Sequence, residues 1–175
     1  MKRLLLPLIL FILFVMEGVA IYLLPPSLSS EHMLIAVHWV FMFLILISLL
    51  YDTEETFFAI IYGICFGLLT DVVYTGVLGV YMFIYPMTLY LLHIAKRLLQ
   101  TNVYMVIIIS IFSLFVIEVL LFFVFSIVGT VQLTFYNFFL YRFIPTMIAN
   151  MIFLLPLYGL TAGKLRQYRQ EQLER

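Results

Sequence analysis

Long runs of apolar residues, separated by short polar stretches, make up most of this chain. The runs approach the roughly 20 residues that a helix needs to cross the hydrocarbon core of a bilayer. The pattern therefore predicts an all-α integral membrane protein with six transmembrane helices in one bundle. The predicted spans are about residues 4–24, 33–50, 57–70, 77–95, 103–128 and 138–162, followed by a short tail at 164–175.

The composition supports lipid as the solvent for most of the chain. Hydrophobic residues make up 66% of the 175 residues, charged residues only 10%, and the mean hydropathy is +1.20. Soluble domains usually carry about a quarter of charged residues, and the short loops leave no room for a sizeable soluble domain. The formal net charge is zero and the chain has no basic run, so nothing suggests binding to nucleic acid.

The basic residues predict which side of the membrane each helix end faces. The chain has nine Lys and Arg residues, and with six spans all except Arg142 fall on the side of Lys2 and Arg3. That side also receives the Lys96–Arg97 turn and the tail. Because an excess of Lys and Arg marks the cytoplasmic side, the sequence predicts a multi-pass protein with both termini in the cytoplasm.

Four acidic or basic residues lie in or beside apolar runs, where each costs on the order of 2.5–3.5 kcal/mol to insert. They are Glu17, Asp71, Glu118 and Arg142. Glu17, Glu118 and Arg142 all fall towards the outer half of their predicted spans. We expect Arg142 to form an ion pair with Glu118 or with Glu17. Such a pair would fix the order of the helices, bind an ion, proton or substrate in transit, or contact a partner helix.

The sixth run carries a polar face. Arg142, Thr146 and Asn150 are spaced four residues apart, which places them on one side of a helix and directs that side into the bundle. The histidines His38 and His93 are isolated and are interpreted as interior or interfacial residues. No spacing of His, Cys or carboxylate residues resembles a metal site, and no cofactor is predicted.

The most specific pattern lies around residues 62–81. Gly63 and Gly67 form a small-residue face that lets two helices approach closely, and Asp71 follows four residues later on the same face. We expect the third helix to end at Asp71, whose carboxylate would bind N–H groups of the turn or cap the fourth helix. Gly76 and Gly79 would supply positive φ angles in that turn.

This glycine and aspartate pattern resembles the signature of the MreD family of rod shape-determining membrane proteins. The opening Met1-Lys2-Arg3 and the stretches at residues 78–83 and 142–146 resemble the Bacillus-type members. By this resemblance Gly63, Gly67, Asp71, Gly76 and Gly79 are the family positions. We interpret them as structural residues first and as partner-binding residues second.

The resemblance implies a non-enzymatic subunit of the bacterial elongation machinery in the cytoplasmic membrane. Members of the family act with MreC, a protein with one transmembrane helix, and with the filament protein MreB. The complex guides the peptidoglycan polymerase RodA and a penicillin-binding transpeptidase. The family is also similar in fold to the substrate-binding S components of energy-coupling-factor transporters.

Two other functions stay open. The chain is either a scaffold of this kind or an S-component-like transport subunit that holds a vitamin-like ligand, although few polar residues are available to hold one. A membrane enzyme is the third possibility. It lacks a nucleophile with an adjacent base and a metal set.

Overall fold

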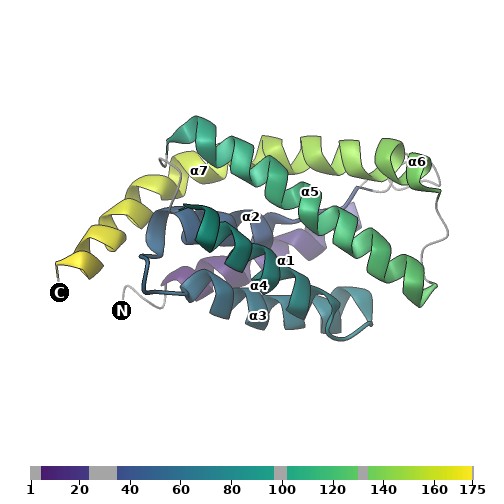
Figure 1. Cartoon of the computed structure of the whole chain (residues 1–175), viewed down its shortest axis with the longest axis horizontal. Helices are drawn as coiled ribbons and strands as arrows, with labels where there is room; N and C mark the ends of the chain where they lie inside the picture. Colours follow the sequence, from purple (N-terminus) through teal and green to yellow (C-terminus); the bar gives the residue numbers. More distant parts are fainter. Residues whose placement is uncertain (1–4, 24–34, 97–101, 130–133, 175) are drawn as a thin grey trace.

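A computed structural model describes residues 5–23, 35–96, 102–129 and 134–174. In these residues the chain forms helices that run back and forth between two ends of the molecule (Figure 1). We call them the Lys96 end, where both termini lie, and the Arg142 end. The elements are α1 (Leu5–Leu23), α2 (Trp39–Leu46) with the π-helical turn η2 (Ile47–Tyr51), α3 (Phe58–Thr70) with η3 (Asp71–Thr75), α4 (Val80–Ala95), α5 (Val103–Val128), α6 (Phe135–Phe138), η5 (Phe139–Phe143) and α7 (Ile144–Leu173).

The predicted runs and the observed helices differ at several ends. The run 103–128 is helical from end to end, as α5. The third helix does not end at Asp71 as expected, because the π-helical turn η3 carries it on to Thr75. The last helix begins at Phe135 and continues through most of the predicted tail, as far as Leu173. The loop predicted before residue 33 lies outside the described residues.

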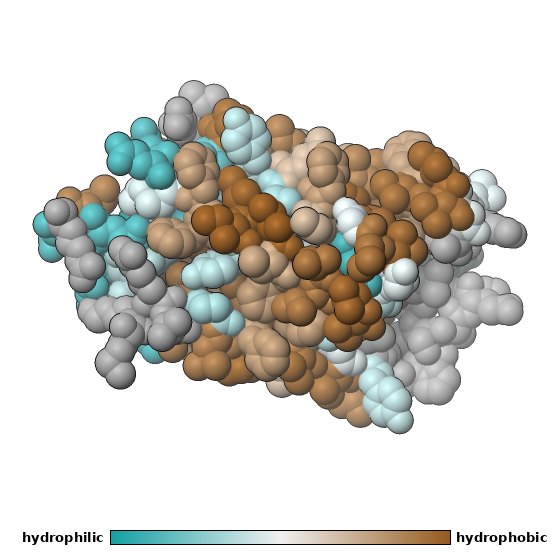
Figure 2. All heavy atoms as spheres, turned by 90° about the horizontal axis from the view of Figure 1, so that it is seen from below, coloured by the Kyte–Doolittle hydropathy of each residue, from teal (hydrophilic) through white to brown (hydrophobic). Residues whose placement is uncertain are grey.

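Within the described residues, three helical stretches are long and apolar enough to cross a membrane. They are Phe58–Thr75, Val103–Val128 and Phe135–Leu173, and three shorter apolar helices accompany them. Apolar residues cover most of the face seen in Figure 2, whereas hydrophilic residues gather towards the Lys96 end. This distribution is that of a membrane protein whose outer surface meets lipid.

The helix α2 forms the centre of the bundle. Every residue from Val40 to Leu46 is at most 1% exposed, and α1, α3, α4, α5 and α7 all contact this helix. A helix that is apolar on all sides faces lipid or is covered by other helices, and the low exposure of α2 shows that helices cover it. The other helices therefore pack around α2.

A lysine and an aspartate close the connection between η2 and α3 at the Lys96 end. Lys96 Nζ donates to the carbonyl oxygens of Ser48, Asp52 and Thr53 at 3.0, 3.1 and 3.2 Å. The Asp52 carboxylate accepts from the N–H groups of Phe58 and Ala59, at the start of α3. Burial raises the pKa of Asp52 to about 6, although these N–H groups and the charge of Lys96 favour the ionised form.

The helices α3 and α4 approach each other most closely, and two glycines permit it. A Cβ atom added at Gly67 would lie 2.6 Å from the carbonyl oxygen of Tyr81, and one at Gly63 would lie 2.8 Å from Leu89 Cδ1. The first neighbour is backbone, which cannot move without separating the helices. The expected small-residue face is therefore the contact surface between α3 and α4.

Replacing Gly67 with Ala should push α3 away from α4 and lower the free energy of unfolding by about 2 kcal/mol, as overpacking does. The change should appear as a lower melting temperature of the purified protein in detergent. Gly159 in α7 is the matched control, because a Cβ there meets nothing within 4 Å. Gly159→Ala should leave stability equal or raise it through helix propensity. Equal melting temperatures for the two variants would contradict the close contact at Gly67.

Candidate functional site

Buried polar side chains gather at the Arg142 end of the bundle, where they bind backbone groups and one another. Each is at most 3% exposed. The set comprises Glu17, His38, Asp71, Glu118, Thr146 and Asn150. In a low-dielectric interior such groups are stable only when they are hydrogen-bonded.

Asp71 joins the end of α3 to the start of α4. Its carboxylate accepts from the N–H groups of Gly79, Tyr81 and Met82 at 2.9, 2.8 and 3.1 Å. The first residues of a helix have N–H groups without partners inside the helix, so this carboxylate caps α4. Both expectations for Asp71, binding the turn and capping the fourth helix, describe this geometry.

The turn depends on two glycines with left-handed backbone. Gly76 has φ 68° and ends η3, and Gly79 has φ 95° and precedes α4. Residues with a Cβ rarely adopt these angles. The positive φ angles predicted from the sequence are therefore present, and they bring the start of α4 back over Asp71.

The residues before α2 are not helical. Ile35–His38, which we call the non-helical segment, was expected to belong to the second span as helix. The helix from Trp39 to Tyr51 is only about 20 Å long at 1.5 Å per residue, short of the roughly 30 Å hydrocarbon core. The non-helical segment therefore carries backbone polar groups into the bundle. These groups need hydrogen-bond partners there.

Two residues of α7 supply those partners. Thr146 Oγ1 accepts from the N–H of Ala36 at 3.0 Å. The Asn150 amide accepts from the N–H of His38 at 2.8 Å and donates to the carbonyl oxygen of Ala36 at 2.9 Å. Thr146 and Asn150, from the polar face predicted for the sixth run, thus replace the helical hydrogen bonds that the non-helical segment lacks.

A carboxylate from α1 caps α2. Glu17 Oε2 accepts from the N–H of Val40 at 3.1 Å, and α2 begins at Trp39. The first N–H groups of a helix have no partner inside the helix, and the Glu17 carboxyl oxygen binds one of them. Glu17 therefore does for α2 what Asp71 does for α4.

An ion pair lies beside the non-helical segment. Arg142 Nε donates to Glu118 Oε2 at 3.0 Å, and His38 Nε2 donates to Glu118 Oε1 at 2.7 Å. Since a carboxylate only accepts, this bond places a proton on His38 Nε2. Of the two expected partners, Arg142 takes Glu118, and Glu17 is used elsewhere.

His38 is the residue whose place the sequence did not reveal. It was interpreted as an isolated histidine, yet its backbone N–H binds Asn150 and its ring binds Glu118. The only sequence signal was a histidine at the outer end of an apolar run. Nothing local indicates its partners, because they lie 80 and 112 residues away.

The network as a whole is suited to holding helices together. Its carboxylates bind N–H groups, an imidazole and a guanidinium of the same chain, and the amide of Asn150 binds backbone. In the described part of the chain, no group of three or more His, Cys, Asp or Glu residues could hold a metal ion. The arrangement fixes the start of α2 and of α4 and the position of α7.

Removing the Asp71 carboxylate should destabilise the hairpin of α3 and α4. Asp71→Ala leaves three N–H groups without their acceptor and should cost about 3 kcal/mol in unfolding free energy. Asp71→Asn keeps one acceptor oxygen and should fall between Ala and the wild type. Melting temperatures of the three purified proteins in detergent measure this order, and a wild-type value for both variants would contradict the cap.

Breaking the ion pair on one side should cost more than removing it completely. Arg142→Gln or Glu118→Gln leaves one charge without its counter-ion, at about 3 kcal/mol. The double variant should recover part of that loss, because two amides can still bond. A thermal double-mutant cycle measures the coupling, with Glu55→Gln at the exposed Lys96 end as a neutral control. Strictly additive losses would mean that the two charges do not interact.

Comparison with known proteins places the chain in a family. The sequence model of the family described as rod shape-determining protein MreD matches residues 2–167. The rod shape-determining protein MreD of Bacillus subtilis (strain 168) is 34% identical over 151 residues, which are 86% of this chain and 86% of that protein. No solved structure matches the chain, so the expected likeness to S components stays a prediction. The chain belongs to the MreD family of rod shape-determining proteins.

Proposed function

We propose that this protein is a non-enzymatic membrane scaffold of the bacterial elongation machinery, which controls cell shape and lateral peptidoglycan synthesis by binding MreC. The observation that carries the proposal is the family match over residues 2–167. Through MreC the protein would act with MreB, RodA and a penicillin-binding transpeptidase, as membership of the family implies.

The proposed topology has six crossings, with both termini in the cytoplasm. Successive helices alternate in direction between the two ends (Figure 1). Lys96 lies beside Thr53, and Arg169 lies with Thr53 and Glu54 around one cavity at the same end. These positive charges support a cytoplasmic Lys96 end. The non-helical segment and the turn at Gly76 would then lie in the outer half of the bilayer.

The use of the interior polar groups supports a scaffold rather than an enzyme or an S component. A ligand-binding bundle needs polar side chains that are available to a ligand. Here Glu17, Glu118, Thr146 and Asn150 bind other residues of the chain. A protein of this kind acts through its surface.

The described residues form an apolar cleft on each side of α5. The first, of about 310 Å³, lies between α4 and α5 and is lined by residues such as Ala95, Ile108 and Phe112. The second, of about 340 Å³, lies between α5 and α7 and includes Ile107 and Met151. Close packing drives helix association in lipid, so we propose these flanks of α5 as the contact for the transmembrane helix of MreC.

The test is a pull-down of the tagged protein from native membranes in mild detergent, with mass spectrometry of the proteins that follow it. MreC and the elongation synthase should co-purify. Ala95→Phe should fill the cleft between α4 and α5 and weaken the recovery of MreC. Val72→Phe is the control, because it adds the same ring at a 59% exposed position away from both clefts.

Each outcome has a clear meaning. Recovery of MreC that falls in Ala95→Phe and not in Val72→Phe supports both the scaffold and the surface. If Ala95→Phe recovers as much MreC as the wild type, the contact with MreC does not lie in the cleft between α4 and α5. Recovery of an ATPase module and a bound vitamin in place of MreC would establish the S-component alternative and contradict the scaffold proposal.

A further inference from the structure

Among the residues that the structure describes, Arg142 donates a hydrogen bond through its inner nitrogen. Its Nε donates to Glu118 Oε2, and no oxygen of the residues that the structure describes accepts from Nη1 or Nη2. The Arg142 side chain is 21% exposed, whereas the Glu118 side chain below it is 1% exposed. One edge of the guanidinium is therefore held by Glu118, and the terminal nitrogens of this partly exposed side chain have no acceptor among the described residues.

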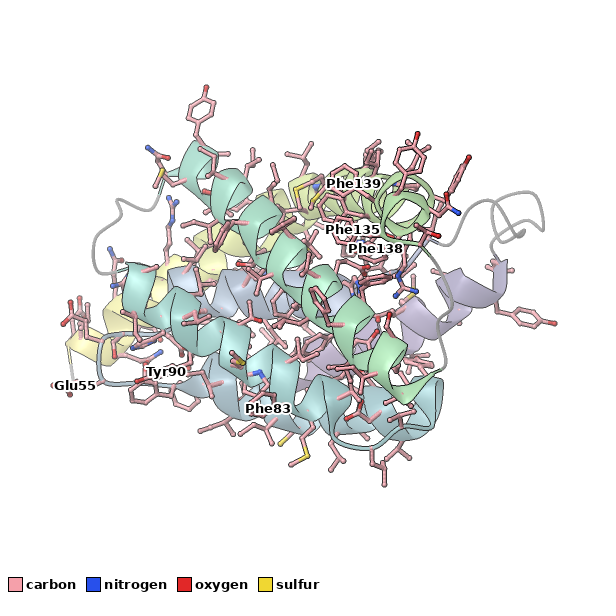
Figure 3. The ribbon with its side chains drawn as sticks, turned by 45° about the vertical axis from the view of Figure 1, so that its right-hand side comes forward. Glu55, Phe83, Tyr90, Phe135, Phe138 and Phe139 are labelled. Atoms are coloured by element: carbon pink, nitrogen blue, oxygen red, sulfur yellow. The ribbon has the colours of Figure 1, made fainter. Side chains whose placement is uncertain are left out.

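The residues around Arg142 place this edge near the boundary between hydrocarbon and headgroups. The turn η5 also presents Phe139 and Tyr141, each about two-fifths exposed, and Tyr136 in α6 is 70% exposed. Figure 3 shows Phe135, Phe138 and Phe139 together at the end of the molecule opposite Glu55. Exposed tyrosines with neighbouring apolar rings are typical of the interfacial belt of a membrane protein.

We propose that the two terminal nitrogens of Arg142 bind the phosphate of a phospholipid headgroup. A guanidinium presents a planar fork of donors that matches phosphate oxygens, and such charge-assisted bonds are strong. Phosphate is present at this depth in every phospholipid leaflet. A carboxylate on a partner helix would fit the same fork, but a phosphate is available at this depth without any partner protein.

This binding site is independent of whether the protein binds MreC. Which leaflet supplies the phosphate follows from the proposed topology, which makes it the outer one. Arg142 would then have two partners, Glu118 inside the bundle and a lipid outside it. The lipid would compensate the guanidinium charge at the surface of the bundle.

The test measures bound lipid by native mass spectrometry of the full chain in detergent. Equal amounts of dioleoyl phosphatidylglycerol and dioleoylglycerol are added, which share their acyl chains and differ by the phosphate-containing headgroup. The variants to compare are Glu118→Gln and the double variant Glu118→Gln with Arg142→Gln. They differ only in Arg142, and neither leaves a buried Glu118 charge unpaired.

The ratio of bound phosphatidylglycerol to dioleoylglycerol should stay at the wild-type value or rise in Glu118→Gln. It should fall about tenfold in the double variant, the loss that one charge-assisted hydrogen bond represents. Arg142→Lys keeps the charge without the fork and should lower the ratio less, which keeps the test decisive if the double variant does not fold. A ratio that is unchanged in the variants of Arg142 would overturn the proposal. Displacement of the lipid by millimolar inorganic phosphate would also overturn it, because the ligand would then be a free anion.

Discussion

The pairing of backbone N–H groups at helix starts is the constraint on which this structure depends. In lipid no water is available to bind an unpaired N–H group, and leaving one buried costs roughly 2–7 kcal/mol. Three carboxylates meet this need, each at the start of a different helix. Glu17 binds the start of α2, Asp52 the start of α3 and Asp71 the start of α4. The order of these three helices is therefore held by contacts between carboxyl groups and backbone.

The hairpin of α3 and α4 combines this cap with close packing. Gly67 lets the backbone of α4 approach, and Asp71 can reach the N–H groups of α4 only because the helices are this close. The π-helical turn η3 continues the helix beyond Asp71 and ends at Gly76. The glycines permit the close approach, and the approach permits the Asp71 cap. This dependence explains why the glycines and the aspartate occur at fixed spacing.

The interior and the exterior of the bundle have different physical tasks. Inside, His38, Glu118 and Asn150 bind residues far away in the sequence and hold the non-helical segment against α7. Outside, exposed apolar residues and the clefts beside α5 face the membrane. A rigid interior with an apolar exterior suits a protein that acts by contact with other membrane proteins and with lipid. Arg142 belongs to both parts, since its Nε binds Glu118 and its side chain is 21% exposed.

The sequence by itself determined the helical class, the apolar runs and the faces of individual helices. The spacing of Gly63, Gly67 and Asp71 places all three on one side of α3, and the spacing of Arg142, Thr146 and Asn150 does the same in the last helix. These relations are local and follow from 3.6 residues per turn. Family membership was accessible for the same reason, because its pattern lies within about 20 residues.

Only the tertiary structure decided which polar groups meet. The choice of Glu118 over Glu17 for Arg142, the place of His38 and the unwinding of Ile35–His38 all depend on contacts across 24 to 114 residues. The continuation of α3 past Asp71 likewise depends on a π-helical turn that satisfies Asp71 and α4 together. Apolar runs specify that a helix will form in lipid, whereas the ends of the helices are set by the partners that their unpaired backbone groups find.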